Sequence, residues 1–273
     1  MTYVWSAVGT VEVNGVRLGC REAGDPDGTP VVLLHGSGSS AGTWDRFAAR
    51  LRGRRTIAID LRGHATSART RGYALASIRD DVLGLIEALR LRDTVLIGHS
   101  VGGYAALAAA LEAPELIGRL VLEDLAAPPK APGSTTRINP VQALGAVAGI
   151  LGSGCDYQLR AVASLLRQLS RPDPAWWARL GEVSQPTLIL SGGPASCIPP
   201  HRLAEVTAAI PNARLATIPV GHRVHSLAPA EFADEVLTFL AQTEPAIAPA
   251  PVMAKPAVAA FRADESAPAA EAA

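Results

Sequence analysis

The sequence predicts an α/β fold in which helices cover both faces of a mostly parallel sheet. Short, continuously apolar runs alternate with segments of helical spacing, and such runs are typical of strands buried on both faces. The runs are residues 30–34, 56–59, 94–97 and 120–122. One of these runs also enters a glycine-rich turn that leads into an alanine-rich helix, a strand–turn–helix unit common in parallel sheets.

The composition is consistent with one large, neutral α/β domain. The chain has 273 residues, 48% of them hydrophobic, and its 25 Lys+Arg balance its 25 Asp+Glu. This balance gives no indication of a nucleic-acid partner. Cys20, Cys155 and Cys197 are far apart and odd in number, which favours free thiols in a reducing compartment. There is no basic–apolar leader and no apolar run near the roughly 20 residues that span a bilayer, so we expect a cytoplasmic protein without a membrane partner.

The first elements are a hairpin and a buried strand. Residues 8–13 and 16–20 flank Asn14-Gly15, a turn pair that indicates a β-hairpin. The strand 30–34 then runs into the loop His35-Gly36-Ser37-Gly38. Helices are expected between the following strands because their apolar residues recur on one face. These helices span residues 44–51, 75–89 and 103–111.

The alternation of predicted strands and helices stops after the strand 120–122. Residues 128–133 are a Pro/Gly cluster, and helical segments without a strand follow it, at 141–150, 157–169 and 174–180. We therefore expect residues 128–184 to form a helical cap, or lid, over the ligand face of the sheet. The alternative interpretation is that residues 128–184 form crossover helices within the main domain.

The remaining core elements follow this segment. They are a strand at 187–190, a helix at 203–210, a strand at 214–218 and a helix at 230–240. The core thus comprises residues 1–127 and 185–242. Residues 243–273 are rich in Ala and Pro and poor in large apolar side chains, so we expect a disordered tail.

The motif that indicates chemistry is Gly98-His99-Ser100-Val101-Gly102. It lies between a strand and a helix, the context that a G-x-S-x-G nucleophile elbow requires. Such a turn holds the serine in a strained conformation and exposes its hydroxyl. The N–H of Val101, at the helix start, is free to face developing negative charge.

Several polar residues share the edge of the sheet at which Ser100 is expected. His35-Gly36, Asp60 and Glu123-Asp124 each follow a predicted parallel strand. Ligands of such sheets bind beyond the carboxyl ends of the strands. The sequence therefore predicts the functional site at this edge.

With these motifs and Gly221-His222, the sequence resembles the α/β-hydrolase superfamily over residues 8–241. The resemblance implies a mostly parallel eight-stranded sheet with a helical cap. It also implies Ser100 as nucleophile, His222 as general base, and an oxyanion hole made by the backbone N–H groups of Ser37 and Val101. No cofactor is implied.

The catalytic acid departs from the usual family pattern, which has Gly-x-x-Asp after the strand 187–190. Here an ungapped count puts Ala195 at that position, and no carboxylate occurs from Ser191 to Arg202. Some relatives carry the acid after the preceding strand, which here ends in Glu123-Asp124. Neighbours on a strand point to opposite faces, so one of them is expected to meet His222. Asp124 is preferred, Glu123 is second, and a chain without an acid is the third alternative.

The expected activity is that of a serine hydrolase, which cleaves a small, largely apolar substrate, most simply a carboxylic ester, through an acyl-enzyme on Ser100. Carbon–carbon bond hydrolysis and cofactor-free perhydrolysis are alternatives with the same triad. A ligand-binding homologue without turnover is an alternative from another class. His222 and His225 lack a third ligand, so no metal site is expected, and His225 is interpreted as a neighbour or surface group.

Overall fold

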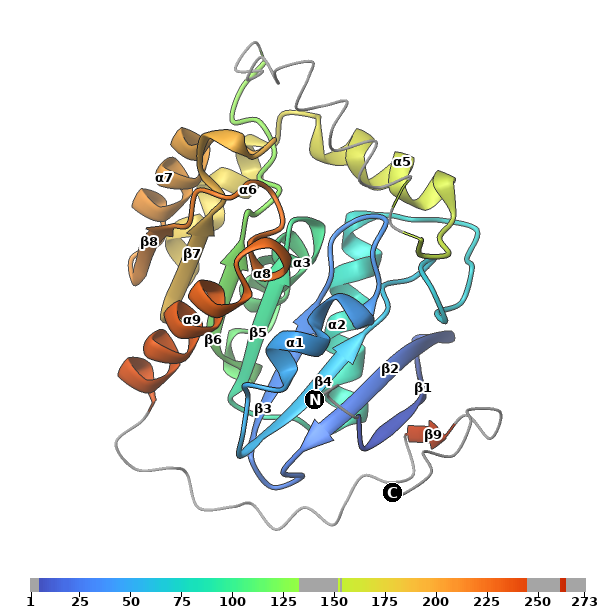
Figure 1. Ribbon diagram of the computed structural model, residues 1–273. Coiled ribbons are helices and arrows are strands. Elements are labelled where there is room, and N and C mark those ends of the chain that lie inside the picture. Colours follow the sequence, from blue (N-terminus) through green and yellow to red (C-terminus); the bar gives the residue numbers. More distant parts are fainter. Residues whose placement is uncertain (1–4, 133–151, 153, 245–260, 264–273) are drawn as a thin grey trace.

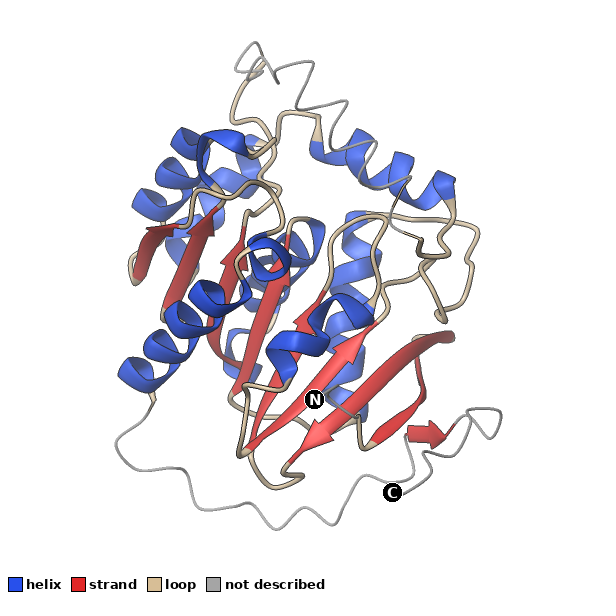
Figure 2. Ribbon diagram, in the orientation of Figure 1, coloured by secondary structure: helices blue, strands red, loops and turns tan. Residues whose placement is uncertain are grey.

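The computed structural model describes residues 5–132, 152, 154–244 and 261–263. Within this part of the chain the strands are β1 (Ala7–Val13), β2 (Val16–Gly24), β3 (Thr29–Leu34), β4 (Arg54–Ile59), β5 (Thr94–His99), β6 (Ile117–Glu123), β7 (Thr187–Ser191), β8 (Ala213–Thr217) and β9 (Phe261–Ala263). They form one sheet in the order β8-β7-β6-β5-β3-β4-β2-β1-β9 (Figures 1 and 2). Strands β3 to β8 are parallel, whereas β2 pairs antiparallel with β1 and β4. The predicted α/β-hydrolase fold is confirmed: β1 to β8 are the eight expected strands of a mostly parallel sheet, and β9 adds a ninth strand at the edge beside β1.

The described helical elements are η1 (Ala41–Trp44), α1 (Asp45–Ala48), α2 (Leu75–Ala88), α3 (Val101–Glu112), η2 (Pro114–Leu116), α5 (Leu159–Leu169), α6 (Pro174–Arg179), η3 (Leu180–Glu182), η4 (Gly193–Ala195), α7 (Pro200–Ala209), α8 (Val224–Leu227) and α9 (Pro229–Thr243). The predicted helix at 44–51 is shorter than expected. After Ala48 the chain continues in i→i+3 turns, with Leu51 N–H bonded to the Ala48 carbonyl, before it enters β4. In the described part of the chain, no helix is long and apolar enough to cross a membrane.

Two hydrophobic cores lie on opposite faces of the sheet because side chains alternate along each strand. Val32 and Leu34 of β3 pack with α2, α3 and α7, whereas Val31 and Leu33 pack with α1 and α9. The helices on the two faces are visible in Figure 1. Each fully buried Val or Leu contributes about 1.5–3 kcal/mol relative to an exposed one, so the two faces together hold the strand ends in place.

Two helices occupy the segment after the Pro/Gly cluster. The amphipathic α5 buries Ala161, Val162 and Leu165, and it lies beyond the carboxyl ends of the strands (Figure 1). Helix α6 begins where the Asp173 carboxylate accepts a hydrogen bond from the Trp176 N–H at 2.9 Å. The helix expected at 141–150 lies outside the described residues.

The C-terminal segment expected to be disordered begins at residue 243, where α9 ends. Most of this segment lies outside the described residues. Residues 261–263, however, form β9 and pair antiparallel with β1, Thr10 opposite Arg262. The expectation of disorder rests on the scarcity of large apolar side chains. A strand can nevertheless pair with an open sheet edge through backbone hydrogen bonds, which do not require such side chains.

A buried ion pair connects the loop after β4 to α2. Arg62 Nε and Nη2 donate to the two Asp81 carboxylate oxygens, each at 2.6 Å. Removing one partner leaves an uncompensated buried charge, which costs about 3–5 kcal/mol.

We therefore expect Asp81→Ala to lower the free energy of unfolding by about this amount in urea titrations. Asp80→Ala, at a half-exposed site on the same helix, is the control and should cost no more than about 1 kcal/mol. Equal losses in the two variants would contradict the assigned importance of the Arg62–Asp81 pair.

Candidate active site

Ser100 occupies a strained turn between β5 and α3. Its backbone has φ 53° and ψ −113°, a conformation that costs a non-glycine residue about 1–3 kcal/mol. The flanking glycines permit the close approach of the backbone. A Cβ on Gly98 would lie 2.3 Å from the Gly102 carbonyl oxygen, and one on Gly102 would lie 2.3 Å from that of Leu34. The structure therefore has the geometry of a nucleophile elbow at Ser100.

The register between β5 and β6 sets the position of Ser100 relative to Asp124. His99 pairs with Glu123 at the ends of the two strands. One residue later, Ser100 N–H donates to the Glu123 carbonyl at 2.9 Å, and Asp124 N–H donates to the Leu190 carbonyl at 2.7 Å. Ser100 and Asp124 are thus the first residues beyond two adjacent strands, and each has a positive φ.

The His222 ring meets Asp124 across the loops that follow β7 and β8. Its Nδ1 lies 2.8 Å from Asp124 Oδ2. Asp124 is fully buried, and it also accepts hydrogen bonds from the Gly192 N–H at 2.8 Å and from the Ser196 hydroxyl. These donors fix the carboxylate, which leaves the His222 ring oriented with Nδ1 toward Asp124 and Nε2 away from it.

Several effects act on the pKa of His222. Burial lowers it, but the hydrogen bond to Asp124 and the nearby Cys197 side chain outweigh burial and raise the pKa above the usual 6.5. An imidazole in this environment binds a proton more strongly than an isolated one. Such a group is suited to accept a proton from a hydroxyl and to remain as a stabilised cation.

The loop after β3 lies against Ser100. A Cβ on Gly36 would come within 3.3 Å of the Ser100 Cβ. His35 fixes this loop, since its Nδ1 donates to the Gly36 carbonyl at 2.7 Å and its Nε2 accepts from the Leu61 N–H at 2.9 Å. His64 Nε2 accepts from the Gly38 N–H at 3.1 Å. His35 and His64 therefore act as hydrogen-bond partners that fix this loop.

The two residues expected to form an oxyanion hole flank this region. Ser37 lies in the loop that His35 and His64 fix, and its buried hydroxyl has no hydrogen-bond partner among the described residues. Val101 is the first residue of α3, so its N–H has no partner within the helix. Both backbone N–H groups therefore lie on segments next to Ser100.

Glu123, the alternative acid, does not meet His222. It is fully buried, and its carboxylate oxygens lie 2.9 and 2.7 Å from His225 Nδ1. Of the two interpretations of His225, a neighbour of His222 or a surface group, the surface group is wrong, because the residue is only 3% exposed. In the sequence, only the three-residue spacing of His222 and His225 indicates that the two histidines lie close together. This spacing does not reveal which carboxylate each histidine contacts.

The loop after β7 contains two donors to Asp124 that the sequence does not predict, the Gly192 N–H and the Ser196 hydroxyl. Ala195, at the position counted for the usual acid, is exposed in η4. Its neighbour Ser196 instead reaches Asp124, and the Ser196 hydroxyl also accepts from the Ile198 N–H at 2.9 Å. A serine in a polar loop gives no sequence signal for such a contact.

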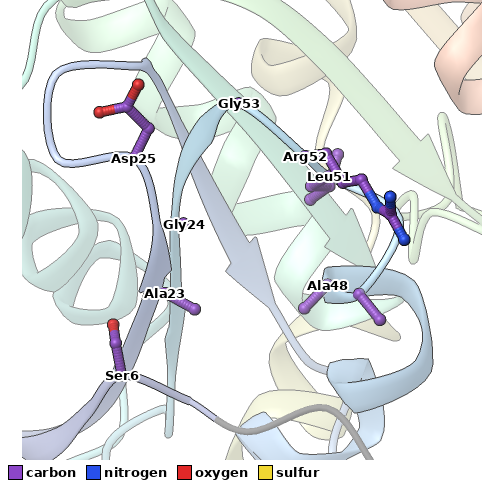
Figure 3. A pocket seen from close by; sticks show the side chains of 9 residues that line it. Ser6, Ala23, Gly24, Asp25, Ala48, Leu51, Arg52 and Gly53 are labelled. Carbon is purple, nitrogen blue, oxygen red and sulfur yellow. The ribbon is translucent and has the colours of Figure 1, made fainter. Parts of the chain in front are cut away.

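A surface hollow of about 370 Å³ lies elsewhere, beside the start of β4 (Figure 3). Small side chains and backbone from β2, α1 and the turn before β4 line it, together with Asp25 and Arg52. Because β4 and β5 are parallel to β3, this hollow is at the opposite end of the sheet from Ser100. Among the described residues, no cluster of three or more His, Cys, Asp or Glu side chains could hold a metal ion.

Comparison with known proteins gives the family. A model of the alpha/beta hydrolase family matches residues 31–235. The chain belongs to this family. It is similar to the mouse sn-1-specific diacylglycerol lipase ABHD11, with 30% identity over 254 residues, which cover 80% of this chain and 83% of the lipase. The zebrafish lipase of the same name is 28% identical and covers 80% of each chain. We conclude that this α/β-hydrolase family member is a hydrolase.

Solved structures support the same fold. A hydrolase from Pseudomonas aeruginosa PA01 superimposes on this hydrolase with a TM-score of 0.73 and 25% identity, over 86% of this chain and 98% of the other. The E-2-(acetamidomethylene)succinate hydrolase has a TM-score of 0.72 and 22% identity over the same shares of the two chains. At such identity the second comparison informs on the fold alone.

The buried His35 makes the stability of this hydrolase depend on pH. Burial and the nearby His64 lower the pKa of His35 from 6.5 to about 4, so the native state stays neutral where the unfolded chain takes up a proton. The free energy of unfolding should therefore decrease as the pH falls from 6.5 towards 4. At about 1.36 kcal/mol per pH unit, His35 alone accounts for about 2 kcal/mol at about pH 5.

Urea unfolding at about pH 7.5 and about pH 5 measures this difference. His35→Gln should reduce it, whereas the matched change of the exposed His201, His201→Gln, should leave it unaltered. The same pH dependence in wild type and His35→Gln would argue against a neutral, buried His35.

Proposed function

We propose that this protein is a serine hydrolase that cleaves a small, largely apolar carboxylic ester through an acyl-enzyme on Ser100. In this mechanism His222 takes the Ser100 hydroxyl proton as the oxygen attacks the ester carbonyl, and it then gives the proton to the leaving alcohol. Asp124 stabilises the imidazolium, while the N–H groups of Ser37 and Val101 bind the oxyanion. Water, activated by His222, then releases the acid and restores Ser100.

The observation that carries this proposal is the 2.8 Å hydrogen bond between His222 Nδ1 and Asp124, on a carboxylate one strand away from the Ser100 elbow. It supplies the acid that is absent at Ala195. A buried carboxylate on Nδ1 keeps the Nε2 lone pair available as a base. This contact supports turnover in preference to ligand binding alone.

The ester class rests on the chemistry of similar proteins. The mouse and zebrafish relatives, 30% and 28% identical, are named as diacylglycerol lipases. Diacylglycerols are carboxylic esters, which an activated serine attacks at the carbonyl carbon.

We further propose that the described part of the segment 128–184 forms a cap over the substrate. Helices α5 and α6 lie in this segment, and α5 is beyond the strand ends, on the side of Ser100. Trp176 stacks on Tyr104 of α3 with ring centroids 6.0 Å apart, and Trp177 Nε1 donates to the Pro128 carbonyl. These contacts support a cap that is anchored on α3.

Covalent labelling tests the nucleophile. A fluorophosphonate probe should label the purified protein at Ser100, with loss of labelling and of p-nitrophenyl acetate hydrolysis in Ser100→Ala. Because the acetate ester is small and reactive, lactones and 1,3-diketones should be assayed beside it to separate ester from carbon–carbon bond cleavage. Absence of both labelling and hydrolysis at every pH from about 6 to about 10.5, a range that includes the raised pKa of His222, would reject the proposal.

The pH profile tests the role of Asp124. His222 must be neutral to act as base, and its pKa is raised, so the acidic limb of kcat/KM should lie above pH 6.5. Asp124→Asn should lower kcat by about 10⁴ and move this limb to lower pH, since the charge that raises the pKa of His222 is lost. Stopped assays across the pH range measure both effects. An unshifted limb in Asp124→Asn would contradict this role.

A further inference from the structure

Glu123 and His225 form a second buried carboxylate–histidine pair that the proposed reaction does not use. The Glu123 carboxylate accepts from the His225 backbone N–H at 2.9 Å as well as from the ring Nδ1. The side chains of Glu123 and His225 are 0% and 1% exposed. A buried carboxylate is costly unless it is paired and fully hydrogen-bonded, so this pair requires an explanation in terms of function or fold.

His225 lies among three segments that each carry part of the site. Its Nε2 is 2.7 Å from the Thr43 hydroxyl oxygen, and its ring packs on Trp44 with centroids 4.4 Å apart. Both residues belong to η1, which follows the Ser37 loop. On the other side its ring centroid is 5.2 Å from that of His99, the residue before Ser100. The histidine thus connects η1 with the ends of β5 and β6.

His222 is held from both ends of its short loop. His99 Nε2 donates to the His222 backbone carbonyl at 2.7 Å, and three residues later Glu123 binds both the backbone and the ring of His225. Glu123 and His99 are register partners on β6 and β5. The two strand ends that position Ser100 and Asp124 therefore also bind the backbone that carries His222.

We propose that Glu123, His225 and Thr43 form a positioning unit that holds the His222 loop in register with Asp124 and with the Ser37 loop. This inference rests on the proposed function, because it assigns His222 as the base. Consecutive carboxylates on β6 have separate tasks: Asp124 contacts the imidazole that moves the proton, and Glu123 keeps that imidazole in place through the loop. None of the three residues contacts the reacting atoms.

Nuclear magnetic resonance of the full-length protein tests the coupling without an activity assay. Imidazole N–H groups in short bonds to carboxylates give low-field proton resonances, and Asp124→Asn identifies the one from His222. Glu123→Gln keeps an acceptor for the His225 N–H but removes the charge. We expect it to shift or broaden the resonance that depends on Asp124, although Glu123 does not touch His222. An unchanged resonance would overturn the proposal.

Kinetics provide the second readout. Glu123→Gln and Thr43→Val should each lower kcat by about 10- to 100-fold with little change in KM. Loss of the hydrogen-bond partners that orient metal-ligating histidines has an effect of this size. Thr43→Ser, which keeps the hydroxyl, should restore most of kcat. The matched control is Thr56→Val on β4, where a buried hydroxyl has no hydrogen-bond partner among the described residues and kcat should be unchanged.

Three other outcomes are decisive. A loss of stability in Glu123→Gln and Thr43→Val with normal kcat would reduce the pair to a structural role and overturn the proposal. Fluorophosphonate labelling of Thr43 in Ser100→Ala would overturn it too, since Thr43 would itself be a nucleophile. If Ser100→Ala keeps full hydrolysis while Glu123→Gln still alters the His222 resonance, the proposed function fails and the positioning unit stands.

Discussion

The hydrogen-bonded register between β5 and β6 is the constraint on which the rest of the site depends. It pairs His99 with Glu123, so that Ser100 and Asp124 leave adjacent strands at the same level. The backbone bond from Ser100 to Glu123 extends this register by one residue into the strained elbow. A slip of one residue would reverse the facing of every side chain on β6 and exchange the roles of the two carboxylates.

The strain at Ser100 and Asp124 is supported by rigid surroundings. Both residues have a positive φ, and both follow strands that are buried on two faces by separate hydrophobic cores. Backbone conformations of this cost persist only where neighbouring structure over-determines them. Here the close approaches at Gly98 and Gly102 and the donors around Asp124 provide that support.

Several buried histidines form hydrogen bonds within the site, and the direction in which their pKa is shifted differs from one histidine to another. Burial lowers the pKa of His35, His64 and His99, which act as hydrogen-bonding elements of the loops. For His222 the contacts with Asp124 and with Cys197 together outweigh burial and raise the pKa. One residue type therefore provides neutral structural hydrogen bonds at three positions and, at His222, an imidazole that binds a proton more strongly than usual.

The sequence by itself determined the α/β class, most element positions and the elbow, because apolar periodicity and the Gly98–Gly102 pattern act within a few residues of chain. It favoured Asp124 over Glu123 as the acid and left a chain without an acid as a third alternative, and it could not assign contacts between side chains, since His222 and Asp124 are 98 residues apart. It also missed the burial of His225 and the Ser196 contact. Only the tertiary structure decided these, because strand register and the packing of the β7 and β8 loops set which side chains meet.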